Sequence, residues 1–89
     1  MSTIEAPVTD VFTENDITEW MSEYLAKLLD VSVDEIDVDA DFRSMGLDSS
    51  STVGISGDLS NSFGVELGES LLYDYPTIKD VASHVVTLQ

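Results

Sequence analysis

The sequence predicts an all-α fold with three main helices and one short helix. Three observations support this class. Apolar residues recur at helical spacing over residues 17–29, the strongest periodicity in the chain. Ser, Thr and Asp residues of the kind that cap helices stand directly before apolar segments. The one alternating stretch, residues 36–39, is too short for a strand and has no partner strand elsewhere. The 89 residues are enough for one small domain.

The first helix is expected to begin near Thr13 or Asn15. Thr13 and Asp16 have the spacing of a capping box, with Asp in place of the usual Glu. The apolar residues that follow repeat at helical spacing, so we expect them to face the core. They are Ile17, Trp20, Met21, Tyr24, Leu25, Leu28 and Leu29. Residues 1–13 carry few large apolar groups, which predicts a flexible N-terminal leader before a folded domain at residues 14–89.

A long connection is predicted from Val31 to Asp48. A loop of this length is uncommon in a compact domain and is often functional. Its apolar residues are spaced irregularly among acidic ones, and we expect them to pin the loop over the core. They are Val33, Ile36, Val38, Phe42, Met45 and Leu47.

A second helix is predicted from Ser49 to about Ser62. Four candidates could cap it, namely Asp48, Ser49, Ser50 and Ser51. Its expected inner face consists of Val53, Ile55, Leu59 and Phe63. Gly54 and Gly57 lie in its interior and each costs about 1 kcal/mol relative to Ala, so this helix should be the weakest. Gly64 is expected to end it.

The C-terminal part is expected to hold one short helical turn and the last helix. The short turn is predicted around Glu69 to Tyr73, and Pro76 ends it. Thr77 and Asp80 form a second capping pair, which opens the last helix. The expected core face of that helix consists of Ile78, Val81, Val85 and Leu88.

The charge of the chain restricts its partners. There are 18 acidic and 3 basic residues, for a formal net charge of -15. Nucleic acid binding is excluded, because phosphate contacts need Lys and Arg. We expect attraction to basic patches on partner proteins, and the alternative is that the charge only keeps a small protein in solution. No apolar run is long enough to cross a bilayer, so we expect no membrane insertion. The absence of cysteine does not determine the compartment but suits the cytoplasmic location that we expect.

Neither a metal site nor a catalytic constellation stands out. Residues 37–48 place acids at several positions of a calcium-loop spacing, but Phe42 stands where that loop needs glycine. We therefore attribute the spacing to chance and predict no metal. The single histidine, His84, is expected at the surface or at its boundary, and no G-x-S-x-G pattern surrounds a serine. The sequence predicts no catalytic residues and no enzyme.

Ser49 is the candidate for chemistry. It follows Gly46-Leu47-Asp48, where a glycine allows a tight turn, and it stands at an expected helix start. A hydroxyl there is exposed, and the positive end of the helix dipole favours an attached phosphate. Taken alone, this tetrapeptide favours a simple N-cap role for Ser49.

The wider pattern resembles the acyl carrier proteins, specifically the polyketide-synthase type. The matching segments in chain order are Asp41-Phe42, Gly46-Leu47-Asp48-Ser49, the apolar Val53, Ile55 and Leu59, Phe63-Gly64-Val65-Glu66-Leu67, Leu71-Leu72-Tyr73-Asp74-Tyr75-Pro76-Thr77 and Val81-Ala82-Ser83-His84-Val85. The resemblance covers about residues 14–88, the expected carrier domain. It implies a four-helix bundle with a long first loop.

The resemblance also implies a cofactor. A phosphopantetheinyl transferase would join 4'-phosphopantetheine from coenzyme A to Ser49, and the arm's thiol would carry acyl groups as thioesters. Asp48 would lie beside the attachment serine and help the transferase to engage. The chain would be a monomer that presents acyl intermediates to ketosynthase, acyltransferase and other acyl-processing enzymes of a polyketide or related lipid pathway, through their basic patches.

Two departures from the family pattern leave alternatives open. Family members usually carry Leu or another large apolar residue after the attachment serine, where this chain has Ser50. The family's second helix often carries charges for docking, whereas Asp58 is the one charge here, so we expect partners to rely on the acidic loop from Asp30 to Asp48. The alternatives are a peptidyl carrier, which the stretch from Tyr75 to Thr77 weighs against, and an unmodified carrier fold that acts as an interaction module. Ser50 and Ser51 are the fallback attachment sites.

Overall fold

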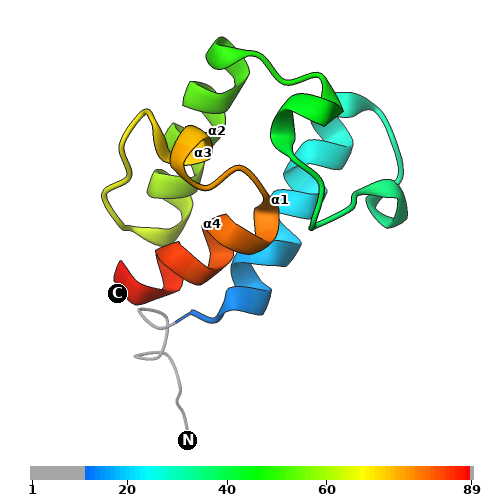
Figure 1. The fold of residues 1–89 in the computed structure, drawn as a ribbon. Helices are drawn as coiled ribbons and strands as arrows, with labels where there is room; N and C mark the ends of the chain where they lie inside the picture. The colour runs from blue at the N-terminus through cyan, green and yellow to red at the C-terminus, as the bar shows by residue number, and fades with distance from the viewer. Residues whose placement is uncertain (1–11, 89) are drawn as a thin grey trace, which may run out of the picture.

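A computed structural model describes residues 12–88 as a bundle of helices (Figure 1). The elements are α1 (Glu14–Leu29), η2 (Val33–Glu35), η3 (Phe42–Met45), α2 (Ser49–Phe63), α3 (Leu71–Asp74), α4 (Ile78–Val85) and η4 (Val86–Leu88), where η marks a 3-10 helix. Within this part of the chain the only β-type pairing is an isolated bridge between Asp41 and Thr77. The predicted all-α class, with three main helices, a short one and a long first loop, is confirmed.

Helix α1 starts at the predicted capping box. The Asp16 N–H donates to Thr13 Oγ1 (3.2 Å), and the Thr13 N–H donates to Asp16 Oδ2 (2.9 Å). The buried residues of the predicted face include Ile17, Met21 and Leu25. Leu28 was expected in the core but is exposed. It continues an edge of residues spaced by four, Trp20, Tyr24 and Leu28, and this edge lies beside the buried stripe rather than within it.

Residues before α1 take part in the core. Phe12 is buried, and its ring packs on Phe63 of α2 with centroids 4.9 Å apart. Phe12 falls within the range predicted as a leader, yet it belongs to the hydrophobic core. The rest of that range, residues 1–11, lies outside the described residues.

The long loop is fixed to the start of α4 by main-chain hydrogen bonds. The Phe42 N–H donates to the Pro76 carbonyl (2.9 Å), and the Lys79 N–H donates to the Val38 carbonyl (3.1 Å). Phe42 is fully buried, which confirms that apolar residues pin the loop. The prediction was wrong for Val33, which is exposed because it lies in η2, a single capped turn without buried residues.

Helix α2 has the predicted start and extends one residue beyond the predicted end, but its inner face differs. Ile55 and Leu59 are buried as expected. Val53 is 39% exposed, and Thr52 and Ser56 are buried instead. These hydroxyls can be buried because both donate within the helix: Thr52 Oγ1 to the Ser49 carbonyl (3.0 Å) and Ser56 Oγ to the Thr52 carbonyl (3.1 Å). The helix ends at Gly64, where φ is 69°.

Helix α4 crosses α1 (Figure 1). It starts as predicted, with the Asp80 N–H donating to Thr77 Oγ1 (3.1 Å), and its core residues Ile78, Val81 and Val85 are fully buried. Leu88 was expected on this face but is exposed, because the chain changes to the 3-10 helix η4 at Val86 and the register shifts. His84 is half-buried, as predicted.

Candidate functional site

Ser49 is the first residue of α2 and lies on the surface. The chain reaches it through a sharp turn at Gly46, which has φ of 85° and ends η3. This left-handed conformation favours glycine, because a Cβ would be strained there. The turn at Gly46 therefore brings the short helix η3 directly beside the first turn of α2.

Asp48 is the residue that caps α2. Its Oδ1 accepts a hydrogen bond from the Ser51 N–H (2.9 Å), and its carbonyl accepts one from the Thr52 N–H (3.0 Å). The hydrogen bond from the Ser51 main chain is the chief reason why the pKa of Asp48 is lowered from its ordinary value of 3.8. Asp48 is therefore ionised at neutral pH.

The hydroxyl of Ser49 is not used by the helix. With Asp48 as the N-cap, the alternative that Ser49 itself caps α2 is wrong. Within residues 12–88 the Ser49 hydroxyl makes no hydrogen bond. Local chemistry had favoured a cap at this position, and the structure instead leaves an exposed, unengaged hydroxyl.

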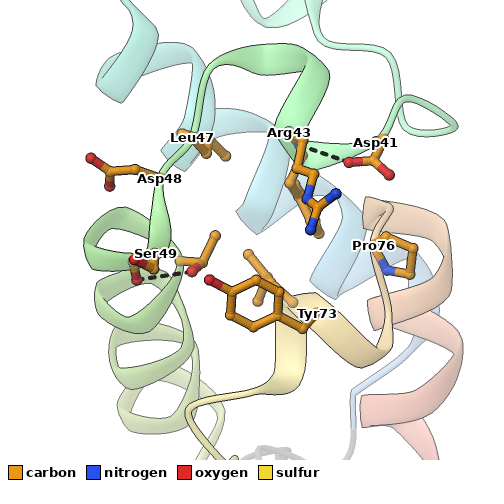
Figure 2. A pocket seen from close by; sticks show the side chains of 10 residues that line it. Asp41, Arg43, Leu47, Asp48, Ser49, Tyr73 and Pro76 are labelled. Carbon is orange, nitrogen blue, oxygen red and sulfur yellow. Dashed lines mark hydrogen bonds between the residues drawn. The ribbon is translucent and has the colours of Figure 1, made fainter.

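A pocket of about 460 Å³ opens beside Ser49. Its walls come from the end of the long loop, from the first turn of α2 and from α3. Both predicted site residues line it, and so do Arg43 of η3 and Tyr73 of α3. In Figure 2 the Arg43 guanidinium projects into the pocket, the Tyr73 hydroxyl is directed toward Ser49 and the Asp48 carboxylate points away.

Three of the acids in residues 37–48, namely Asp37, Asp41 and Asp48, accept hydrogen bonds from main-chain N–H groups. Asp37 Oδ1 accepts from the Asp39 N–H (2.9 Å), and Asp41 Oδ1 accepts from the Arg43 N–H (2.7 Å). In the described part of the chain, no three His, Cys, Asp or Glu side chains gather closely enough to hold a metal ion. The calcium-loop spacing is explained by these turns.

Comparison with known proteins identifies the family. A model of the phosphopantetheine attachment site matches residues 19–85, most of the chain. The protein belongs to this family. As such a carrier protein, it holds 4'-phosphopantetheine covalently. The site's exposed, unengaged serine hydroxyl beside a pocket with a cation fits this group.

Relatives define the type of carrier. The acyl carrier protein TtuC of Teredinibacter turnerae is 41% identical over 68 residues, which cover 76% of this chain and 77% of TtuC. The chain also matches polyketide synthases, of which it spans only 1–4%. The protein is a phosphopantetheine carrier protein of the polyketide-synthase type, as the resemblance implied, and its similarity to TtuC supports acyl carrier function.

Solved structures confirm the carrier fold. A free-standing peptidyl carrier protein from an Acinetobacter baumannii secondary metabolic pathway has a TM-score of 0.78 at 36% identity, over 84% of this chain and 94% of that one. An acyl carrier protein of Anabaena sp. PCC 7120, described as having a variant phosphopantetheinylation-site sequence, has a TM-score of 0.80 at 33% identity, over 99% and 94% of the two chains.

No helix among residues 12–88 is long and apolar enough to span a membrane.

The sequence did not single out Arg43 or Tyr73 as site residues. A signal for Arg43 was available, because it is one of only three basic residues and lies between two matching motifs. Tyr73 stood inside a matching segment, but nothing local shows that α3 brings it to the start of α2. Only the packing of α3 places it there.

Proposed function

We propose that Ser49 Oγ is the attachment point of the 4'-phosphopantetheine arm. The proposal rests on one observation at the start of α2. Asp48 caps the helix, and the exposed Ser49 hydroxyl makes no hydrogen bond within residues 12–88. The bound arm supplies a terminal thiol that carries acyl groups as thioesters. The positive end of α2 favours the negative charge of the phosphate.

Ser49 is a better candidate than the two serines that follow it. Ser51 is half-buried, and its N–H is held by Asp48. Ser50 is exposed, but it does not line the pocket. Of the three, Ser49 alone combines an exposed hydroxyl with a place in the pocket wall.

Ser50 affects the transferase rather than the fold. The position is exposed, so a large apolar side chain here would face a partner and not the core. We infer that the serine weakens an apolar contact with the transferase and slows loading without preventing it. The Anabaena structure, described as an acyl carrier protein with a variant site sequence, supports the view that such departures are compatible with a carrier.

Incubation with coenzyme A and a broad-specificity phosphopantetheinyl transferase tests the site, with intact mass as the readout. Wild type, Ser50→Ala and Ser51→Ala are expected to gain the phosphopantetheine mass, and Ser49→Ala is expected to gain none. Circular dichroism of Ser49→Ala confirms that the variant is folded. A gain by Ser49→Ala, or none by wild type, contradicts the proposal.

The partners proposed are a phosphopantetheinyl transferase, a ketosynthase, an acyltransferase and other acyl-processing enzymes. Carrier domains of polyketide synthases work with such enzymes. We propose that these partners meet the acidic loop through basic patches, because Asp58, the one charge of α2, accepts a hydrogen bond from Tyr24. Exposed loop acids such as Asp34 and Asp39 remain available. In this proposal the carrier itself is a cytoplasmic, non-catalytic monomer.

A peptidyl carrier is the second candidate, and the likeness to the Acinetobacter peptidyl carrier favours it. The two functions differ in the enzyme that loads the arm. An amino-acid-activating enzyme would load a peptidyl carrier, and an acyltransferase would load an acyl carrier. Competition between the two for the same holo-protein separates them, and we expect loading by the acyltransferase.

A further inference from the structure

The Arg43 side chain is a cation in an acidic protein and has no ion-pair partner among the residues that the structure describes. The chain has 18 acidic and 3 basic residues, so a cation should find a carboxylate easily. Within residues 12–88, however, the Arg43 guanidinium makes neither an ion pair nor a hydrogen bond. It is the one basic side chain that lines the pocket beside Ser49.

The two carboxylates that line the pocket together with Arg43 accept hydrogen bonds from main-chain N–H groups. Asp41 Oδ1 accepts the Arg43 main-chain N–H (2.7 Å), and Asp48 Oδ1 accepts the Ser51 N–H (2.9 Å). Figure 2 shows the Asp41 carboxylate bonded to the Arg43 main chain and the Asp48 carboxylate pointing away, while the guanidinium projects into the pocket. The positive charge of Arg43 therefore faces the pocket without an ion pair to any residue in the described part of the chain.

Tyr73 faces the same pocket from α3. Its neighbours Leu71 and Leu72 are buried and fix α3 on the core, whereas Tyr73 is 54% exposed. Packing therefore does not explain this aromatic residue. Its hydroxyl makes no hydrogen bond within residues 12–88 and is directed toward Ser49 (Figure 2). The pocket thus has two exposed donor side chains, one on η3 and one on α3, that make no hydrogen bond to another residue within 12–88.

We propose that Arg43 and Tyr73 bind the phosphodiester of the arm carried by Ser49. This inference rests on the proposed attachment at Ser49. A guanidinium can give two parallel hydrogen bonds to phosphate oxygens, and a phenol can give one more. The phosphodiester adds a negative charge beside the ionised Asp48, and Arg43 offsets it. The proximal end of the arm is then held in the pocket, whose volume of about 460 Å³ is within the range of small-molecule sites, while the thiol end stays free.

NMR of the loaded protein tests this. The Arg43 Nε–Hε signal is expected to shift on loading, and the ³¹P signal of the phosphodiester should move toward its position in the urea-unfolded loaded protein in Arg43→Gln and, less, in Tyr73→Phe. In Arg43→Lys the ³¹P signal should lie between those of Arg43→Gln and wild type, because lysine keeps the positive charge but cannot give two parallel hydrogen bonds. Lys79→Gln is the matched control, since it removes an exposed cation that does not line the pocket, and its ³¹P signal should equal that of wild type.

The outcomes separate this inference from the attachment site. No mass gain at Ser49 overturns both. Normal loading with an unchanged Arg43 signal, or equal ³¹P effects of Arg43→Gln and Lys79→Gln, overturns the inference alone. An Arg43 shift that arises only when the cargo itself carries a carboxylate also overturns it, because the anion recognised would then be the cargo and not the phosphodiester.

Discussion

The Tyr24 hydroxyl of α1 donates a hydrogen bond to the Asp58 carboxylate of α2, and the bond joins the two longest helices of the described chain. Asp58 raises the pKa of Tyr24 above its ordinary value of 10.0, chiefly because the hydrogen bond favours the protonated phenol. The bond also engages the one charge that α2 carries. It therefore ties α1 to α2 through a side-chain contact.

Removal of this hydrogen bond should destabilise the protein at neutral pH. Tyr24→Phe is expected to lower the free energy of unfolding by about 1 kcal/mol, the worth of a typical hydrogen bond. Because the folded pKa is raised, the stabilisation is fully present below pH 10.0 and is lost as the pH rises through the folded value. Urea unfolding at several pH values checks both statements.

The matched control for Tyr24 is Tyr73→Phe, which removes a phenol that has no hydrogen bond within the described residues. It should leave the stability of the unloaded protein unchanged at neutral pH. Equal effects of the two substitutions would contradict the role given to the bond with Asp58.

The Asp48 cap of α2 should stabilise the fold by an amount that depends on pH. Asp48→Ala is expected to lower the melting temperature at neutral pH, because the Ser51 N–H loses its acceptor. The lowered pKa of Asp48 means that its contribution is present above pH 3.8 and is lost as the pH falls below that value. Thermal unfolding of both proteins should therefore show a difference that shrinks in acid, and a constant difference would refute the assignment.

The two glycines inside α2 should be open to stabilising substitution. A Cβ added at Gly54 or Gly57 would meet nothing within 4 Å. Gly54→Ala and Gly57→Ala are each expected to raise the free energy of unfolding by about 1 kcal/mol, the difference in helix propensity. Gly64→Ala is the contrasting variant, since its φ of 69° should make the same change destabilising by about 1 kcal/mol. Chemical denaturation distinguishes these signs.

Docking is predicted to depend on the acidic loop rather than on α2. Replacement of Asp34, Glu35 and Asp37 by their amides should lower kcat/KM for loading by the transferase by about tenfold, because charge steers encounter with a basic partner. The effect should fade at high salt. Asp58→Asn, which removes the one charge of α2, is the comparison variant and should leave loading by the transferase unchanged. Unchanged turnover in the loop variant, together with loss of turnover in Asp58→Asn, would place docking on α2 instead.

The helix boundaries could be predicted because their signals are local. Thr13, Asp48, Gly64 and Thr77 each stand at a helix end and act through main-chain groups a few residues away. No partner element is needed to recognise such a residue.

The faces of the helices could not be predicted fully, because they depend on packing. Val53 is apolar but exposed, while Thr52 and Ser56 are buried once their hydroxyls bond within α2. The prediction that Leu88 is buried was wrong for another reason, because the change from an α-helix to a 3-10 helix shifted its register. Hydrophobicity alone does not determine these outcomes.

In the candidate site, too, some residues could be predicted from local sequence and others only from the packing of the fold. Asp48 and Ser49 are adjacent in a motif and could be named from the sequence. Arg43 and Tyr73 are 30 residues apart and meet at the pocket only through the packing of η3 and α3. Their place in the site could therefore be recognised only from the folded structure.

Attachment of the arm at Ser49 is tested most directly by fragmentation mass spectrometry of the loaded protein. Trypsin cleaves after Arg43 and Lys79, so one peptide, residues 44–79, contains Ser49, Ser50 and Ser51 together. Fragment ions of this peptide locate the phosphopantetheine among the three serines. All of the group on Ser49 is the result expected. Its presence on Ser50 or Ser51, or an unmodified peptide after complete incubation, would contradict the account.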